Sequence, residues 1–405
     1  MTSSSYTVEL TDTASAVNVS AWDQVRAAGD ADVFSSLRFL RAIEESSLAD
    51  EGFWYCTVRS GSRPVAVTNL FLMRVDLDVL APPNSRLVIR KLRPLTGRLL
   101  SPLVLFCGVP VSAGQRAVIV DPSCNVRAVL DLLEKRIREH AKQAGAILVC
   151  FKELAETDAT LLERLSELGY IAAQTPAMYT LRASFASFDN YVNALRAQYR
   201  QDIIRSLRKA RSRRLVLDSV LGEDAIARAY RADVHALYEE VEASAVHRLE
   251  QLPRDFFLAL ARQFPDDLTL TLATLGEEPV GCHWGLRNGA DYFFLFCGLR
   301  YAANHDADVY FNLMYAELGN AFDAGSSVVQ LGQTADEFKA RLGASPSPRT
   351  ISVRATNRVV NRLLTWLAPA LFVEEAASPP KSIFRNSASS AGGGQPGITS
   401  GQRGE

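Results

Sequence analysis

The sequence contains no apolar run long enough to cross a membrane. Its two most apolar stretches, residues 99–111 and 363–373, are shorter than the roughly 20 residues that a spanning helix requires. The first five residues do not form a basic segment followed by an apolar run, so we predict no signal peptide. These absences predict a cytoplasmic protein without a transmembrane segment.

Familiar cysteine, metal and nucleotide motifs are also missing. The six cysteines form no C-x-x-C pair, so we expect buried free thiols in a reducing compartment, with no disulfide framework and no zinc site. The sequence has no Ser-His-Asp elbow, Walker loop, G-x-G-x-x-G fingerprint or paired-histidine motif. No metal site is therefore predicted.

The composition is that of a globular protein with two domains. The chain has 405 residues, which is too long for one typical hydrophobic core. Its hydrophobic content of 48% and charged content of 22% exclude a disordered or membrane-embedded class. Residues 376–405 are mostly Ser, Gly, Pro and Ala, and we predict that this tail is disordered because it offers no core.

The stretch 268–343 carries the clearest pattern. Leucines alternate with threonines from Leu268, and turn residues at 276–279 and at Asn288-Gly289 separate this segment from two further apolar strands. This pattern predicts three antiparallel strands, a helix, a strand and a short helix that ends at Gly343. Such an order indicates a mixed α/β sheet with a helix packed on it. The expected elements after the three strands are a helix at 306–322 and a strand at 328–331.

Particular residues in this stretch resemble a known family. They are Tyr310, Asn312 and Tyr315 on the helix, and the sequence Leu331-Gly332-Gln333-Thr334 followed by Lys339 and Gly343. This arrangement resembles the C-terminal half of GNAT-type acyltransferases of the FemAB and BioF2-like group, which are built from two GNAT-like domains. The resemblance implies two tandem domains, at 33–183 and 184–375, between an N-terminal segment 1–32 and the disordered tail 376–405.

The remaining elements agree with two such domains. The first domain has the element order that one GNAT-like domain would have. This order is two paired strands, then strand, helix, strand, helix and a closing strand. A basic run at 86–98 is interpreted as a solvated surface loop, although it could meet a phosphate. Helices are expected at 33–47, 125–144, 158–168, 224–242, 252–263 and 357–367, and strands at 53–58, 65–72, 103–109, 146–151 and 350–353.

Residues 195–215 predict one strongly basic helix. Eight Arg and Lys residues stand against the single acid Asp202, and apolar residues recur every four positions from Leu195. Arg200, Arg205 and Arg208 are our candidates for contacts with an anionic donor, and a solvated basic face is the alternative. Aromatic residues that would stack on bases are not interleaved with these arginines, which argues against RNA.

His283 is the candidate general base. Gly281 and Gly285 flank it on the same face of its strand, which would allow a ligand or another backbone to lie close. Imidazole titrates near neutral pH, so it suits proton transfer from an attacking amine. The alternative is a histidine packed against a neighbouring helix.

The resemblance implies further site residues. Lys339 would contact an anionic group and is our second catalytic candidate, with a solvated lysine as the alternative. The acyl-transfer channel would be lined by Tyr301, Tyr310, Asn312, Tyr315, Gln330 and Gln333, of which Tyr315 could instead belong to the core.

The sequence does not identify the acyl donor. Residues 298–308 lack the glycine-rich loop that binds a donor pyrophosphate, and they place Asp306 and Asp308 at the helix start, where either carboxylate would also suit a cap. We expect no tightly bound cofactor. An acyl or aminoacyl group would pass directly from acyl-CoA, acyl carrier protein or aminoacyl-tRNA to a small-molecule amine, since positioning supplies most of such a rate. The alternative is a non-catalytic protein that uses the basic helix for an anionic partner; DNA is not expected.

Overall fold

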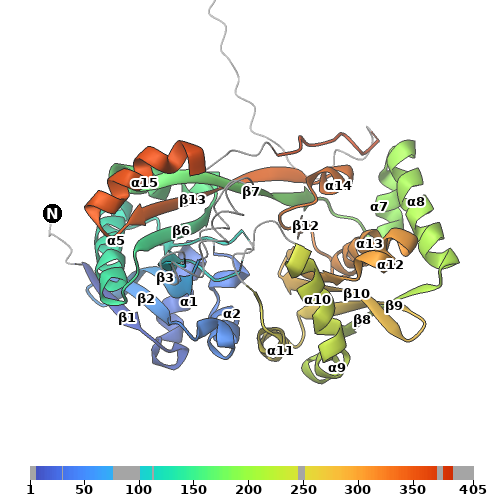
Figure 1. Cartoon of the computed structure of the whole chain (residues 1–405), viewed down its shortest axis with the longest axis horizontal. Coiled ribbons are helices and arrows are strands. Elements are labelled where there is room, and N and C mark those ends of the chain that lie inside the picture. The colour runs from blue at the N-terminus through green and yellow to red at the C-terminus, as the bar shows by residue number, and fades with distance from the viewer. Residues whose placement is uncertain are drawn as a thin grey trace, which may run out of the picture.

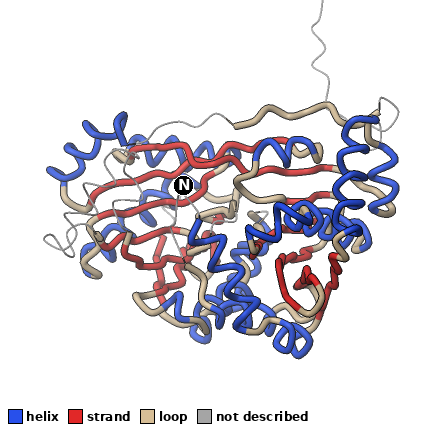
Figure 2. Tube along the Cα trace, turned by 45° about the vertical axis from the view of Figure 1, so that its right-hand side comes forward, coloured by secondary structure: helices blue, strands red, loops and turns tan. Residues whose placement is uncertain are grey.

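The computed structural model describes residues 6–29, 31–75, 101–111, 114–244, 251–371 and 377–385. One mixed sheet of 13 strands runs through both halves of the chain, and helices cover its faces (Figures 1 and 2). The strand order is β1-β2-β3-β4-β6-β13-β7-β12-β11-β10-β9-β8, with β5 paired to β3. The predicted mixed α/β class is therefore confirmed. The basic run 86–98 lies outside the described residues.

The first half starts with an antiparallel meander and closes with a crossover. Strands β1 to β4 pair antiparallel, and the crossover through α5 makes β6 parallel to β4. Its strands are β1 (Tyr6–Thr11), β2 (Phe53–Ser60), β3 (Arg63–Arg74), β4 (Leu103–Cys107), β5 (Ile119–Val120), β6 (Leu148–Leu154) and β7 (Ile171–Arg182). Its helices are α1 (Val19–Ala28), α2 (Leu37–Glu44), α5 (Val126–Gln143) and α6 (Ala159–Glu167).

The second half repeats this plan. Strands β8 to β11 pair antiparallel, and the crossover through α12 and α13 makes β12 parallel to β11. Its strands are β8 (Leu215–Leu221), β9 (Leu268–Leu275), β10 (Glu278–Asn288), β11 (Asp291–Leu299), β12 (Val328–Gln330) and β13 (Ser345–Ala355). Its helices are α7 (Phe188–Ala194), α8 (Ala197–Ser212), α9 (Glu223–Ala229), α10 (Ala232–Ser244), α11 (Arg254–Gln263), α12 (Tyr301–Ala307), α13 (Val309–Asp323), α14 (Asp336–Arg341) and α15 (Arg358–Leu371).

The two halves share strands where they meet. β13 follows the second half in sequence, yet it pairs with β6 and β7, while β7 also pairs with β12 (Figure 1). Aromatic side chains add a packed contact, because Phe34 meets Phe293 and Phe39 meets Phe256 edge to face. Residues 345–355, which the prediction assigned to the second domain, thus lie inside the sheet of the first half.

The N-terminal residues belong to the first half. β1 pairs along its whole length with β2, and Tyr6, Val8 and Leu10 turn their side chains towards the core while the residues between them are exposed. α1 buries Trp22 and Val25 against the same half. The predicted separate segment 1–32 therefore contains a strand and a helix of the fold.

Several predicted helices differ from the observed ones. The helix predicted at 33–47 is an α-helix only over Leu37–Glu44, and three others also differ. The helix predicted at 195–215 ends at Ser212, and Arg214, with φ 59°, turns the chain into β8, which the sequence did not suggest. The helix predicted at 224–242 breaks into α9 and α10 at Tyr230, whose carbonyl accepts hydrogen bonds from Arg254. The helix predicted from residue 306 begins earlier and breaks at Asp308, whose φ is 51°.

Part of the predicted tail is ordered against the second half. Ile383 is fully buried, and Phe384 packs on Phe185 and Tyr191. The Arg196 amide donates to the Ile383 carbonyl at 2.8 Å. The prediction of disorder is wrong for residues 377–385. Ile383 and Phe384 supply enough apolar surface to hold this segment on the second half, although the average composition of the tail is poor in large apolar residues. Residues 386–405 lie outside the described residues.

Candidate active site

The parallel strands β11 and β12 separate after a short pairing. They are joined only at Asp291–Val328, Tyr292–Val329 and Phe293–Gln330. β11 then continues to Leu299 with Leu295 as an unpaired extra residue, since Trp284 faces Phe296 while Gly285 faces Phe294. β12 ends at once, and its chain turns away through a loop with three positive φ angles, at Gly332, Thr334 and Ala335. The strands therefore open into a wedge.

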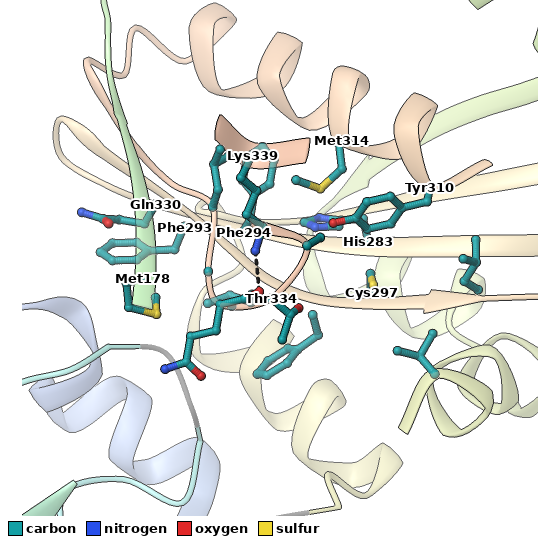
Figure 3. A pocket seen from close by; sticks show the side chains of 18 of the residues that line it. Met178, His283, Phe293, Phe294, Cys297, Tyr310, Met314, Gln330, Thr334 and Lys339 are labelled. Carbon is teal, nitrogen blue, oxygen red and sulfur yellow. Dashed lines mark hydrogen bonds between the residues drawn. The ribbon is translucent and has the colours of Figure 1, made fainter. Parts of the chain in front are cut away.

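A cavity of about 420 Å³ fills this wedge (Figure 3). Its size suits a small-molecule or cofactor group. The structure brings six of the predicted site residues to its walls, and these are His283, Tyr301, Tyr310, Gln330, Gln333 and Lys339.

Two predicted channel residues do not line the cavity. Asn312 is buried on α13, where its side-chain amide donates to Ser206 Oγ and to the Asp308 carbonyl. Tyr315 is a core residue that packs against Phe188 and Phe338. Both residues hold α13 in place, so the core alternative applies to Tyr315 and the channel role is wrong for both.

Lys339 lies at the cavity wall with almost no exposure to solvent. Its amine donates to the backbone carbonyl of Gln333 in the β12–α14 loop (Figure 3). Burial lowers the pKa of Lys339 from 10.5 to about 7, and the nearby Cys297 and Asp336 oppose this effect only in part. The side chain can therefore change its charge near neutral pH, and a solvated lysine is excluded.

Gln333 connects this loop to the first half of the chain. Its side-chain nitrogen donates to the Pro176 carbonyl at 2.9 Å and approaches Glu153 Oε1 at 3.4 Å. Glu153 is buried at the end of β6, with φ 55°, and its other oxygen accepts from the Gly114 amide. The first half thus fixes the loop carbonyl that holds Lys339.

His283 faces a carboxylate that the sequence prediction missed. His283 Nδ1 lies 3.7 Å from Glu317 Oε1, and Glu317 Oε2 accepts from the Tyr292 hydroxyl at 2.7 Å. Among the residues that the structure describes, neither His283 Nδ1 nor Glu317 Oε1 has a hydrogen-bond partner. The two buried atoms therefore face each other without a hydrogen bond.

The glycines beside His283 make room for α13. A Cβ at Gly281 would collide with Leu313 and Val309 of that helix, and a Cβ at Gly285 would collide with Glu317 and Tyr292. They therefore allow close helix packing and not, as one reading of the sequence had it, close approach of a ligand. The sequence did hold a sign of Glu317, because this acid stands on the face of α13 whose other residues are apolar.

The predicted arginines lie outside the cavity, on α8. Arg200 donates to the Leu195 carbonyl, Arg205 is exposed and pairs with Asp202, and Arg208 is exposed. On the next turn, Lys209 pairs with Asp308 at 2.7 Å, which draws α8 onto the start of α13. Asp308 stands at the N-cap position of α13, but its side chain makes no cap hydrogen bond there. Nor does Asp306, which is exposed beside His305.

The described residues contain no group of three or more His, Cys, Asp or Glu side chains placed to hold a metal ion. In the same ranges, no helix combines the length and the apolarity needed to span a bilayer.

The fold and site define a class. A mixed sheet whose central parallel strands part, with a crossover helix between them, is the plan of the GNAT fold. Here this plan occurs twice, and the cavity described above lies in the second copy. Residues 197–340 match the acetyltransferase (GNAT) domain family. No curated protein sequence matches the chain significantly.

Solved structures extend the likeness to the whole chain. The chain is similar to FemX, with 11% sequence identity, a TM-score of 0.53, and coverage of 89% of this chain and 99% of FemX. It is similar to a tandem GNAT protein from the clavulanic acid biosynthesis pathway, with 13% identity, a TM-score of 0.52, and coverage of 87% and 99%. The chain therefore has the FemAB-like double GNAT fold that the resemblance predicted, and the match to the acetyltransferase (GNAT) domain family falls within its second half.

Proposed function

We propose that the protein transfers an acyl or aminoacyl group from an activated, phosphate-bearing donor to the amine of a small acceptor, inside the wedge between β11 and β12. The observation that supports this most directly is the presence of His283 and Lys339 on the walls of one cavity of about 420 Å³. A proton acceptor and a cation at one cavity are what direct transfer to an amine requires.

His283 would remove the proton of the attacking amine. The amine nitrogen forms a bond to the acyl carbonyl carbon, and the resulting tetrahedral intermediate then breaks its bond to the thioester sulfur or ester oxygen. The proton leaves through His283 and returns to the departing thiolate or alkoxide, so no covalent enzyme intermediate is needed. Glu317 would hold the Nδ1–H tautomer and leave Nε2 free to accept, which makes Glu317 a positioning residue.

Lys339 would stabilise negative charge in the same cavity. With a pKa of about 7, its amine is part protonated at neutral pH, and an approaching anion favours the protonated form. The negative charge would be the oxyanion of the tetrahedral intermediate or an anionic group of the donor. The Gln333 carbonyl orients the amine in either role.

The basic face of α8 supports a donor that carries phosphates. α8 packs against α12 and α13, whose residues Tyr301 and Tyr310 line the cavity. Arg205 and Arg208 are exposed on this helix. Acyl-CoA and aminoacyl-tRNA both carry phosphates, so this surface suits both donors.

The test is a transfer assay with two donors, an acyl-CoA panel and charged tRNA, each offered with a panel of small amines and read by product mass. We expect product with one donor class and a loss in R205Q/R208Q that grows as donor concentration falls. R136Q, on α5 of the first half, is the matched control. Binding of a donor without product for any amine would contradict the enzyme and favour a binding protein that uses the same helix.

A further inference from the structure

Helix α15 exposes a continuous apolar stripe to solvent. Val359, Leu363 and Trp366 are 75%, 55% and 76% exposed, and they follow each other by four and three positions on one face. Val360, on the flank of this stripe, is also exposed. By contrast, Trp22 and Trp284 are fully buried in the two halves. Exposure of a tryptophan together with three aliphatic side chains on one short helix indicates a binding surface.

The inner side of α15 fixes this orientation. Asn361 accepts from the Ala355 amide and donates to the Gly169 carbonyl, which ties the helix to β13 and to the end of α6. Leu364 packs on the core. α15 lies on the first half, over β13 and far from β12 and β10 (Figure 1). The apolar stripe therefore points outward because the opposite face is bound.

The charged side chains of α15 have one sign. Arg358 and Arg362 are exposed one turn apart and border the stripe, since successive residues are about 100° apart around a helix. Neither forms an ion pair within the described ranges. The sequence contains no Asp or Glu between residues 338 and 373. The outward face of α15 itself is thus apolar with a cationic border.

We infer that this face of α15 docks on the surface of an anionic phospholipid bilayer. Trp366, Leu363 and Val359 would enter the boundary between headgroups and acyl chains, where tryptophan is favoured, and both arginines would meet lipid phosphates. A second copy of the chain is the weaker occupant, because a symmetric pairing of two α15 helices would bring four arginines together without an acid. The inference does not depend on the proposed function.

The test measures partition of the full chain onto vesicles by co-sedimentation. We expect binding to phosphatidylglycerol vesicles, weaker binding to phosphatidylcholine vesicles, and a blue shift of Trp366 fluorescence on binding. R358Q/R362Q should lower the partition coefficient on phosphatidylglycerol by about 30-fold, from two charges near an anionic surface. L363Q/W366Q should lower it by about tenfold or more on both lipids.

Leu221→Gln on β8, another exposed apolar position, is the matched control and should bind like the wild type. Circular dichroism and thermal unfolding would establish that each variant folds. Absence of binding to anionic vesicles, or binding that both double variants retain, would overturn the inference. A dimer in sedimentation equilibrium that L363Q/W366Q dissociates would overturn it as well, in favour of a second copy.

Discussion

The two halves use the same wedge differently. In the first half, β4 and β6 pair from Val104–Leu148 to Cys107–Phe151, and the wedge beyond them is filled by Gln115, Lys152 and Glu153, all buried. A Cβ at Gly108 would contact the Gln115 side-chain amide and Lys152. In the second half the wedge holds the cavity with His283 and Lys339.

The difference teaches that duplication of the fold does not duplicate the site. Each half has a parallel pair that separates and a crossover helix that covers it. In the first half the protein's own polar side chains fill the space, and one of them, Glu153, reaches Gln333 in the second half. The filled wedge therefore supports the open one, and variants in the two should have unequal effects.

We expect the largest difference in activity between substitutions of the two buried lysines, Lys339 in the open wedge and Lys152 in the filled one. Lys339→Met should lower kcat/KM by about 100- to 1000-fold, because it removes the cation that would meet developing negative charge in the proposed mechanism. Lys152→Met, the matched change in the filled wedge, should lower it by less than about threefold once the variant is shown to be folded. Steady-state kinetics measure both. Equal losses would mean that the first wedge takes part in catalysis.

The charge state of Lys339 predicts a pH dependence of stability. Its pKa is about 7 in the folded chain and 10.5 when solvated, so between these values the unfolded chain binds more protons at this group. The free energy of unfolding should therefore rise with pH in this window, by up to about 1.4 kcal/mol per pH unit relative to Lys339→Met. Denaturant titrations of both proteins at pH 7, 8 and 9 measure the difference. A constant difference would show that Lys339 stays charged.

The close approach of His283 to Glu317 belongs to the open wedge. Glu317→Gln should lower kcat by about 10- to 100-fold with little change in KM, since it leaves substrate contacts but releases the imidazole tautomer. The pH profile of kcat should also shift, which a purely structural role would not produce. Tyr292→Phe keeps the carboxylate and removes only one hydrogen bond, so its effect should be smaller. The reverse order would identify Tyr292 as the more important group.

The smallest expected effect concerns the contact between Glu153 and Gln333, which connects the two wedges. Glu153→Gln should lower kcat only a few-fold, because the Pro176 carbonyl still holds Gln333 when the contact with Glu153 weakens. Glu156→Gln, an exposed acid nearby, is the control. Kinetics at saturating substrate provide the measurement. An unchanged kcat in both variants would show that the first half contributes packing alone.

The sequence by itself determined the local elements and the class. Alternation at Leu268 and the Asn288-Gly289 turn sufficed for the strands and the hairpin, because turn chemistry and side-chain periodicity act over a few residues. The double GNAT fold followed from the family resemblance that the residues around Lys339 carry. It also pointed to His283, Lys339 and four of the polar cavity residues.

Only the tertiary structure decided how distant segments combine. β13 enters the first half, Ile383 packs on the second, and Glu317 meets His283 through contacts between residues far apart in the chain, which no local pattern encodes. Whether a wedge is open or filled depends on the volume of side chains brought from several elements. Asn312 and Tyr315 show the same limit. They lie on α13, the predicted helix, but the packing of that helix turns both side chains towards neighbouring elements and away from the cavity.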